Sequence, residues 1–246
     1  MPTARMLLII ALMAALIPLP VRAETHQEIS SPLIGVSCNL PESNAASLII
    51  MNNYFNSSDN YWWDHVNLTI AVQAHPSASE EQLAAIHGAI ATWGAILDDC
   101  FGGLITLTDV TGTQPSEQQA ADIVVHFVPT AGGGVFSGKA NCGDHGCPNV
   151  IVRSDFPFGL YGDFSHFGPE FIRRVTLPEV GHALGIGHAT NLNESNDLMG
   201  YGWFNAGTEP VLSDCDLDAL AFVFAWALEG SEPYPPAEGP YNCSLD

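Results

Sequence analysis

Apolar and polar residues alternate along several short segments of this chain, and one longer segment repeats them at helical spacing. Residues 66–72 alternate with a period of two, which predicts a half-buried strand. Residues 104–110, 122–128 and 149–153 have the same strand-like character. Between the first two strands, apolar residues fall on one helical face, at Leu83, Ile86, Ile90, Trp93 and Leu97. The pattern therefore predicts a long helix between two strands.

Capping residues mark the ends of the predicted helices. Ser77 and Ser79 are candidate N-caps, with Glu80 or Gln82 three residues further on, and two glycines follow the helix from Gly102. A second helix is expected to start after Gly168-Pro169. A third is expected from Ser213 to about Leu228, with Ser213 as its cap and aspartates in its first turn, where the helix dipole favours them.

The first 23 residues are typical of a secretory signal. Arg5 precedes an almost unbroken apolar run from Met6 to Leu19, and small residues lead to Ala23. The run is too short to span a bilayer, which disfavours the alternative of a membrane anchor. We therefore expect cleavage after Ala23, an extracellular protein, and no membrane partner.

Three further regions follow the signal. Residues 24–60 are polar and are interpreted as an N-terminal extension or short pro-segment, residues 61–230 as the folded domain, and residues 231–246 as a proline-rich tail. The formal net charge of −21 becomes more negative when Arg5 and Arg22 are removed with the signal. Such acidity repels phosphate backbones, so nucleic acid is excluded as a partner.

Six cysteines in an exported chain predict up to three disulfides. Cys142 and Cys147 bracket a four-residue turn that a local bridge could close. The pairing of the other four is open: Cys38, Cys100, Cys215 and Cys243.

The segment 178–188 carries most of the motif H-E-x-x-H-x-x-G-x-x-H of the metzincin zinc proteases. Glu179, His182, Gly185 and His188 have the required spacing, and residues 197–201 resemble the Met-turn that follows it. Pro178 stands where the family has its first histidine.

The order of strand, long helix, strands, motif helix, Met-turn and final helix resembles the matrixin branch of the metzincins over residues 61–230. The resemblance implies an α+β, zincin-like catalytic domain with a twisted, mainly parallel sheet, two long helices and a C-terminal helix. It also implies bound Zn²⁺ with His182 and His188 as ligands, Glu179 as general base for a zinc-activated water, and Met199 as a packing floor. Gly185 permits the left-handed turn that brings His188 to the metal.

A substitute for the missing histidine is needed, because a catalytic zinc normally has three protein ligands. Tyr201 is one candidate, since astacins and serralysins have a tyrosine near the metal at this position. The other candidate donors are His166, His145 and, more weakly, His126.

Pro178 leaves two structures open for the motif helix. The helix continues through the proline with a kink, or it starts afresh with Thr176 as N-cap and Glu179 closing a capping box. Cys38 also shows a thin resemblance to the cysteine switch of matrixin pro-segments, although a disulfide role is favoured.

Two functions follow from this sequence. The first is a secreted, monomeric zinc endopeptidase that acts on peptides or proteins. The second is a pseudoprotease that binds peptides without cutting them, because Pro178 cannot coordinate zinc.

Overall fold

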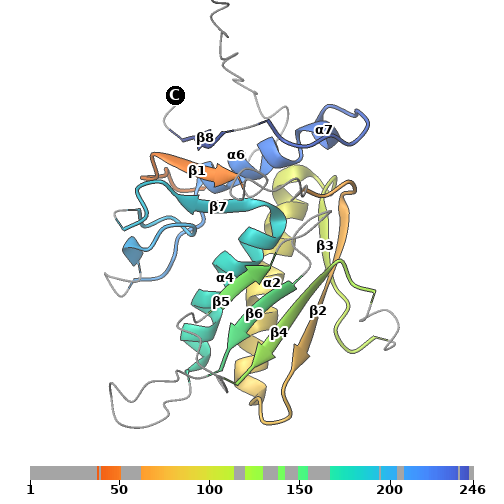
Figure 1. Cartoon of the computed structure of the whole chain (residues 1–246), viewed down its shortest axis with the longest axis vertical. Coiled ribbons are helices and arrows are strands. Elements are labelled where there is room, and N and C mark those ends of the chain that lie inside the picture. The colour runs from red at the N-terminus through yellow and green to blue at the C-terminus, as the bar shows by residue number, and fades with distance from the viewer. Residues whose placement is uncertain are drawn as a thin grey trace, which may run out of the picture. The chain divides into compact units, whose positions relative to one another are not determined.

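Five strands form the main sheet, in the order β3-β2-β4-β6-β5 (Figure 1). The computed structural model describes residues 38, 40–50, 62–113, 120–129, 138–141, 149–154, 167–193, 195–203, 208–237 and 239–243. Strands β2 (Asn67–Ala74), β3 (Thr106–Asp109), β4 (Ile123–Val128) and β6 (Asn149–Arg153) are parallel. Strand β5 (Gly138–Asn141) joins β6 as an antiparallel edge. The predicted mainly parallel sheet is confirmed.

Helix α2 (Glu80–Phe101) connects β2 to β3 and begins and ends as its sequence predicts. Ser79 is its N-cap, and Ser79 and Gln82 form a reciprocal capping box. Gly102 ends the helix with a positive φ of 60°. Its buried face includes Ile86, Ile90, Trp93 and Leu97, which pack into the core.

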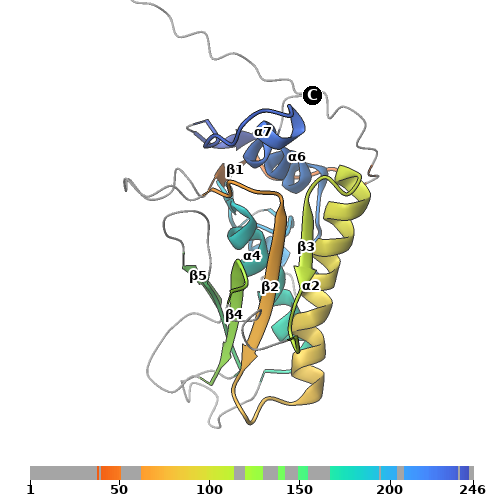
Figure 2. The ribbon, with the colours of Figure 1, turned by 90° about the vertical axis from the view of Figure 1, so that its right-hand side faces the viewer.

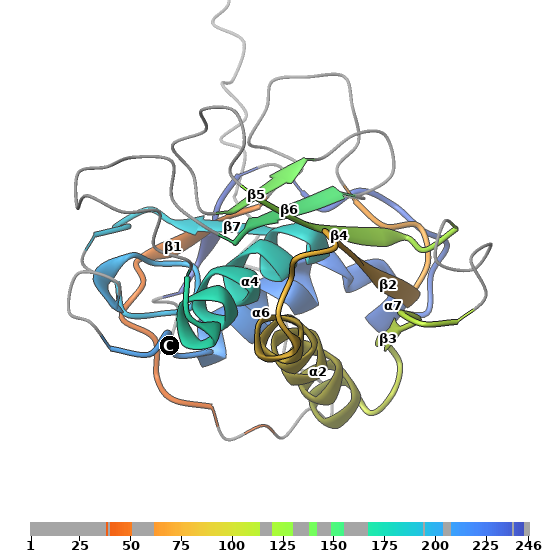
Figure 3. The ribbon, with the colours of Figure 1, turned by 90° about the horizontal axis from the view of Figure 1, so that it is seen from below.

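Helix α4 (Pro169–Leu184) lies beside α2, and both cover the same face of the main sheet (Figure 3). The core fills the space between this helical layer and the inward side chains of β2, β4 and β6. Strand β4 illustrates this arrangement, because its residues alternate between buried and partly buried along its whole length, as expected when one face of a sheet packs on the core. The second long helix therefore starts where the Gly168-Pro169 signal predicts.

A second, three-stranded sheet joins both ends of the chain to the segment that follows α4. It has the order β7-β1-β8, with β1 (Ser47–Ile50) antiparallel to both β7 (Ile186–Ala189) and β8 (Tyr241–Asn242). Leu48 and Ile50 of β1 are fully buried. Ala45, Leu48 and Ile50, which lie in the segment interpreted from sequence as an extension, thus belong to the core.

Helices α6 (Asp214–Val223) and α7 (Ala225–Leu228) lie beyond one end of the main sheet (Figures 1 and 2). The sequence predicts one helix here, and the structure interrupts it at Phe224. Two disulfides, Cys38–Cys100 and Cys215–Cys243, tie the terminal segments to α2 and α6. Cys142 and Cys147 lie outside the described residues. In the described part of the chain, no helix has the length and apolar character needed to cross a membrane.

Candidate metal centre

Helix α4 continues through Pro178 without a break. Thr176 does not cap a new helix, because its hydroxyl donates to the carbonyl of Ile172 at 2.7 Å in the helix interior. The alternative in which Glu179 closes a capping box is therefore wrong. Pro178 is buried inside the helix, where it removes the amide that would bond the carbonyl of Arg174.

Two tryptophans bond backbone carbonyls of α4 from outside the helix. The indole of Trp93 donates to the carbonyl of Leu177 at 2.9 Å, and that of Trp63 donates to the carbonyl of Ala183 at 2.8 Å. The second bond satisfies one of the carbonyls that a helix C-terminus leaves unpaired. Sequence reasoning placed Trp93 in the core but missed this role for both indoles, since a contact between distant elements has no local signal.

Gly185 ends α4 and turns the chain into β7. Its φ of 113° lies in the left-handed region, as the motif predicts. A Cβ atom at this position would lie 2.8 Å from Cγ1 of Val223, so the turn also needs a residue without a side chain. Four residues after α4 ends, the short strand β7 presents His188 beside His182 of the helix.

The rings of His182 and His188 lie edge to face, with their centroids 4.5 Å apart. Nδ1 of His182 is 2.9 Å from the carbonyl of Ile186, and Nδ1 of His188 is 3.2 Å from the carbonyl of Met199. A carbonyl only accepts, so each Nδ1 carries the hydrogen. Each Nε2 therefore keeps a lone pair, which is the arrangement found in metal-ligating histidines.

Burial keeps both imidazoles neutral. Burial, and after it the neighbouring His188, lower the pKa of His182 to about 3, against the opposing bond to the Ile186 carbonyl. Burial also lowers the pKa of His188, against the opposing bond to Met199. Both rings therefore hold their Nε2 lone pairs at neutral pH without competition from a proton.

Tyr201 lies beside His188. Its hydroxyl oxygen lies 3.4 Å from Nε2 of His188, and the two rings are 5.0 Å apart. Two ligand atoms at the usual zinc distances and a tetrahedral angle are themselves about 3.4 Å apart. The phenol side chain is 41 % exposed, so the site opens to solvent on this side.

Met199 and Glu179 complete the surroundings of the two imidazoles. Met199 is fully buried, and its sulfur would lie 3.0 Å from a Cβ atom placed on Gly181 of α4. Glu179 lies on α4 three residues before His182, so the two side chains share one side of the helix. One carboxylate oxygen of Glu179 is buried and the residue as a whole is partly exposed.

The other sequence-predicted donors do not add to this site. His145 and His166 lie outside the described residues. His126 points elsewhere, with its Nε2 bonded to Asn149 of the neighbouring strand at 3.0 Å. Cys38 is in a disulfide with Cys100, so the cysteine-switch alternative is wrong. Within the described residues, no three or more His, Cys, Asp or Glu side chains form a group that could hold a metal.

Comparison with known proteins gives structural likenesses alone: no protein-family model and no curated protein matches the chain. One similar structure is high choriolytic enzyme 1, a hatching enzyme zinc-protease from Oryzias latipes (medaka fish), at 16 % identity and a TM-score of 0.31; the match covers 56 % of this chain and 55 % of that chain. Another is metalloproteinase-II from Bacteroides fragilis, at 14 % identity and a TM-score of 0.40, covering 73 % and 58 %. In both cases the match spans little more than half of the other protein.

Proposed function

We propose that this chain is a zinc-dependent endopeptidase in which His182, His188 and Tyr201 are the protein ligands and Glu179 is the general base. The observation that carries the proposal is the shared state of the two imidazoles. Both are neutral and both have Nδ1 bonded to a carbonyl, which leaves each Nε2 with a free electron pair.

The side chains present fit a zinc ion in donor type and number. Two imidazole nitrogens and one phenol oxygen make three protein ligands, the number typical of catalytic zinc. Bound zinc would lower the pKa of a water and polarise a peptide carbonyl. Glu179 would take the proton from that water and pass it to the leaving amine. The carbonyls of Ile186 and Met199 would hold the imidazoles in the tautomer that this requires.

The two disulfides of the described residues support an extracellular location, because disulfides persist in oxidising compartments. We propose cleavage of the signal after Ala23, peptide or protein substrates, and a monomeric enzyme. The N-terminal sequence of the exported protein tests the cleavage, and Glu24 is the expected first residue.

A second candidate function, peptide binding without cleavage, is favoured by one observation. Pro178 stays in the helix at the position of the family's first histidine, and the described residues offer two imidazoles at this place. If Tyr201 does not complete the site, zinc affinity falls well below that of a three-ligand site.

The experiment compares zinc content and cleavage of an unfolded protein across four proteins: wild type, Glu179→Gln, Tyr201→Phe and Pro178→His. The proposal predicts one zinc per chain and measurable cleavage in wild type. Glu179→Gln is expected to keep the zinc and lose cleavage, because it removes the base but no ligand. Tyr201→Phe is expected to lose zinc affinity.

Pro178→His separates the two functions. If this variant alone binds zinc and cleaves protein, the wild type is the pseudoprotease and the peptidase proposal fails. If wild type is already active, the added imidazole raises its zinc affinity. Removing a residue that only hydrogen-bonds a metal ligand changes metal affinity about 10- to 100-fold, so a direct ligand is expected to have at least that effect.

A further inference from the structure

Two aspartates from distant parts of the chain meet in the interior across one serine. Asp197, in the turn before Met199, is 3 % exposed, and Asp216, in the first turn of α6, is fully buried. The hydroxyl oxygen of Ser213 lies 3.2 Å from Oδ2 of Asp197 and 3.2 Å from Oδ2 of Asp216. The pair is separate from the zinc ligands proposed above.

The hydrogen-bonding capacity of Ser213 is consistent with one proton held by this pair. Ser213 has a single hydroxyl hydrogen and cannot donate it to both carboxylates. When Ser213 donates to Asp197, its contact with Asp216 is a hydrogen bond only if Asp216 carries a hydrogen on Oδ2 and donates it to Ser213. The backbone N–H of Ser213 still donates to the same Oδ2 at 3.0 Å. No described residue donates a well-formed bond to Oδ1 of Asp216, which suits a neutral carboxyl better than a buried anion.

The surroundings of Asp216 also favour its protonated, neutral form. Burial, and after it the charge of Asp197, raise the pKa of Asp216 to about 7, against the opposing bonds from Ser213 and the Leu198 amide. From its own helix, Asp214 adds a second carboxyl nearby, which accepts the amide of Ser43 at 2.9 Å. In the described part of the chain, no basic side chain is bonded to any of these three aspartates.

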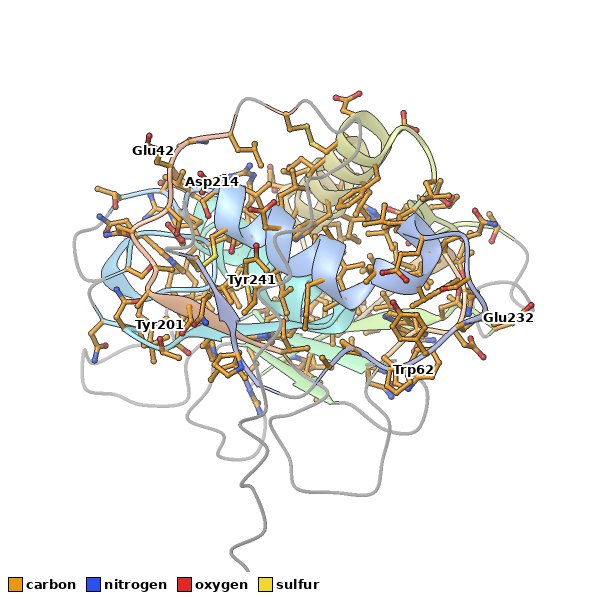
Figure 4. The ribbon with its side chains drawn as sticks, turned by 90° about the horizontal axis from the view of Figure 1, so that it is seen from above. Glu42, Trp62, Tyr201, Asp214, Glu232 and Tyr241 are labelled. Carbon is orange, nitrogen blue, oxygen red and sulfur yellow. A yellow bond between two sulfur atoms is a disulfide. The ribbon has the colours of Figure 1, made fainter. Side chains whose placement is uncertain are left out.

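The N-terminal strap, residues 40–46, is hydrogen-bonded to the turn and to the helix that supply this pair. Its Ser43 hydroxyl donates to Oδ2 of Asp197, and the amide of Asp214 donates to the carbonyl of Pro41 at 3.1 Å. Figure 4 shows Asp214 at the start of α6, beside the segment that carries Glu42. These bonds fasten the strap to both elements that supply the carboxyls.

Asparagines continue the attachment of the strap on the loop before the turn. Oδ1 of Asn44 accepts the amide of Asn196 at 2.9 Å. Asn191 donates to the carbonyl of Asn44 and accepts the amide of Ala46, each at 2.9 Å. The strap therefore lies on the loop that leads into Met199, whose carbonyl holds His188.

We propose that Asp197 and Asp216 form a proton-linked latch, in which one shared proton keeps the N-terminal strap docked on the turn that orients His188. On deprotonation, the hydrogen on Oδ2 of Asp216 passes to solvent and the charge of the pair changes from −1 to −2. Two buried anions then share one hydroxyl, and exposure to water relieves them. The strap is the cover whose release admits that water. The latch concerns folding around the site and holds whether or not the site binds zinc.

Hydrogen exchange of the full, metal-free chain between pH 5.5 and 8.5 tests the latch. Rates in the strap are corrected for intrinsic exchange and compared with those of α2. One linked proton changes the opening equilibrium up to tenfold per pH unit between the pKa of the exposed carboxyl and that of the buried one. Protection of the strap is therefore expected to fall about 10- to 30-fold as the pH rises to about 7, and to level off above it. Global unfolding releases the same proton, so protection of α2 falls by no more than this factor and stays above that of the strap at every pH.

Two variants isolate the pair. Asp216→Asn keeps a donor for Ser213 but cannot ionise, so strap protection is expected to be independent of pH. Asp214→Asn is the matched control from the same helix turn. This substitution removes the contact with Ser43 and so weakens docking of the strap at every pH, but the protection of the strap should still fall as the pH rises. A pH-dependent fall that persists in Asp216→Asn overturns the latch, as does a flat profile in wild type.

A measurement on wild type covers the case in which Asp216→Asn does not fold. Carbon-13 NMR of aspartate side chains should show one carboxyl that titrates near pH 7. If all aspartates titrate below pH 5, the shared proton does not exist.

Discussion

Replacing Asp216 with asparagine gives a quantitative test of the buried carboxyl pair through folding stability. The carboxyl has an ordinary pKa of 3.8 in the unfolded chain and about 7 in the folded protein. Between these values, the folded protein holds a proton that the unfolded chain has released. The stability from this group is therefore complete below about pH 4 and is lost as the pH rises to about 7.

The magnitude follows from the size of the shift. One pKa unit corresponds to about 1.4 kcal/mol, so the raised pKa of Asp216 corresponds to a loss of about 4 kcal/mol in wild type. Asp216→Asn does not have this loss, although it gives up one hydrogen bond at a pH-independent cost of about 1 kcal/mol. The free energy of unfolding of the variant, minus that of wild type, should rise by about 4 kcal/mol between pH 4 and 7. Release of the strap before global unfolding makes this an upper value.

Urea unfolding with a metal chelator present, followed by far-UV circular dichroism at half-unit steps of pH, measures this difference. Groups present in both proteins cancel, including His182, whose lowered pKa costs stability as the pH falls from 6.5 towards 3. Thr176→Val is the control, because it removes a buried, uncharged hydroxyl and its difference from wild type should not depend on pH. If the Asp216→Asn difference stays constant within about 1 kcal/mol, the reasoning about the pair is refuted.

Three further substitutions test the local arguments by urea or thermal unfolding. Gly185→Ala should lower the free energy of unfolding by at least about 3 kcal/mol, because it combines a positive φ with a steric clash. Its control, Gly102→Ala, also has a positive φ but open space around it, and should lower the free energy of unfolding by about 1 kcal/mol. Equal losses would contradict the clash. Trp63→Phe should cost about 1–3 kcal/mol by leaving a buried carbonyl of α4 unpaired. Its control, Trp62→Phe, should cost less, because the indole nitrogen of Trp62 bonds to no described residue. Pro178→Ala should stabilise the protein by about 1–2 kcal/mol, since restoring the helix amide outweighs the lost packing of the proline ring. Destabilisation would show that the packing of the ring contributes more than the restored hydrogen bond.

Local patterns predicted the parts of the fold whose stabilising contacts lie close in sequence. The period-two pattern found β2, and the cap at Ser79 with apolar positions at helical spacing found α2. The small sheet was missed because β1 has four residues, β8 has two, and their partners lie far along the chain. Strand β5 was missed because it lies in a glycine-rich segment that reads as a loop.

In the candidate site, too, contacts that are local in sequence were predictable and contacts between separate elements were not. Motif spacing predicted that His182 and His188 lie side by side with Gly185 at the turn between them, because this geometry follows from one helix and the turn that ends it. The Asp197–Asp216 pair had no such signal. Asp216 was read as a residue suited to a helix N-terminus, and only the fold brings Asp197 to the same serine. Buried polar contacts between distant segments depend on tertiary packing, which a local pattern does not encode.

The contacts around α4 explain how a proline is accommodated in the motif helix. Pro178 removes one bond of the helical ladder, yet the helix is held from outside by the indoles of Trp93 and Trp63. His182 is oriented by the Ile186 carbonyl, and His188 by the turn that the N-terminal strap covers. None of these contacts uses the side chain at position 178. The imidazoles therefore keep their orientation whether that residue is proline or histidine, and a histidine placed there meets two imidazoles that are already in position.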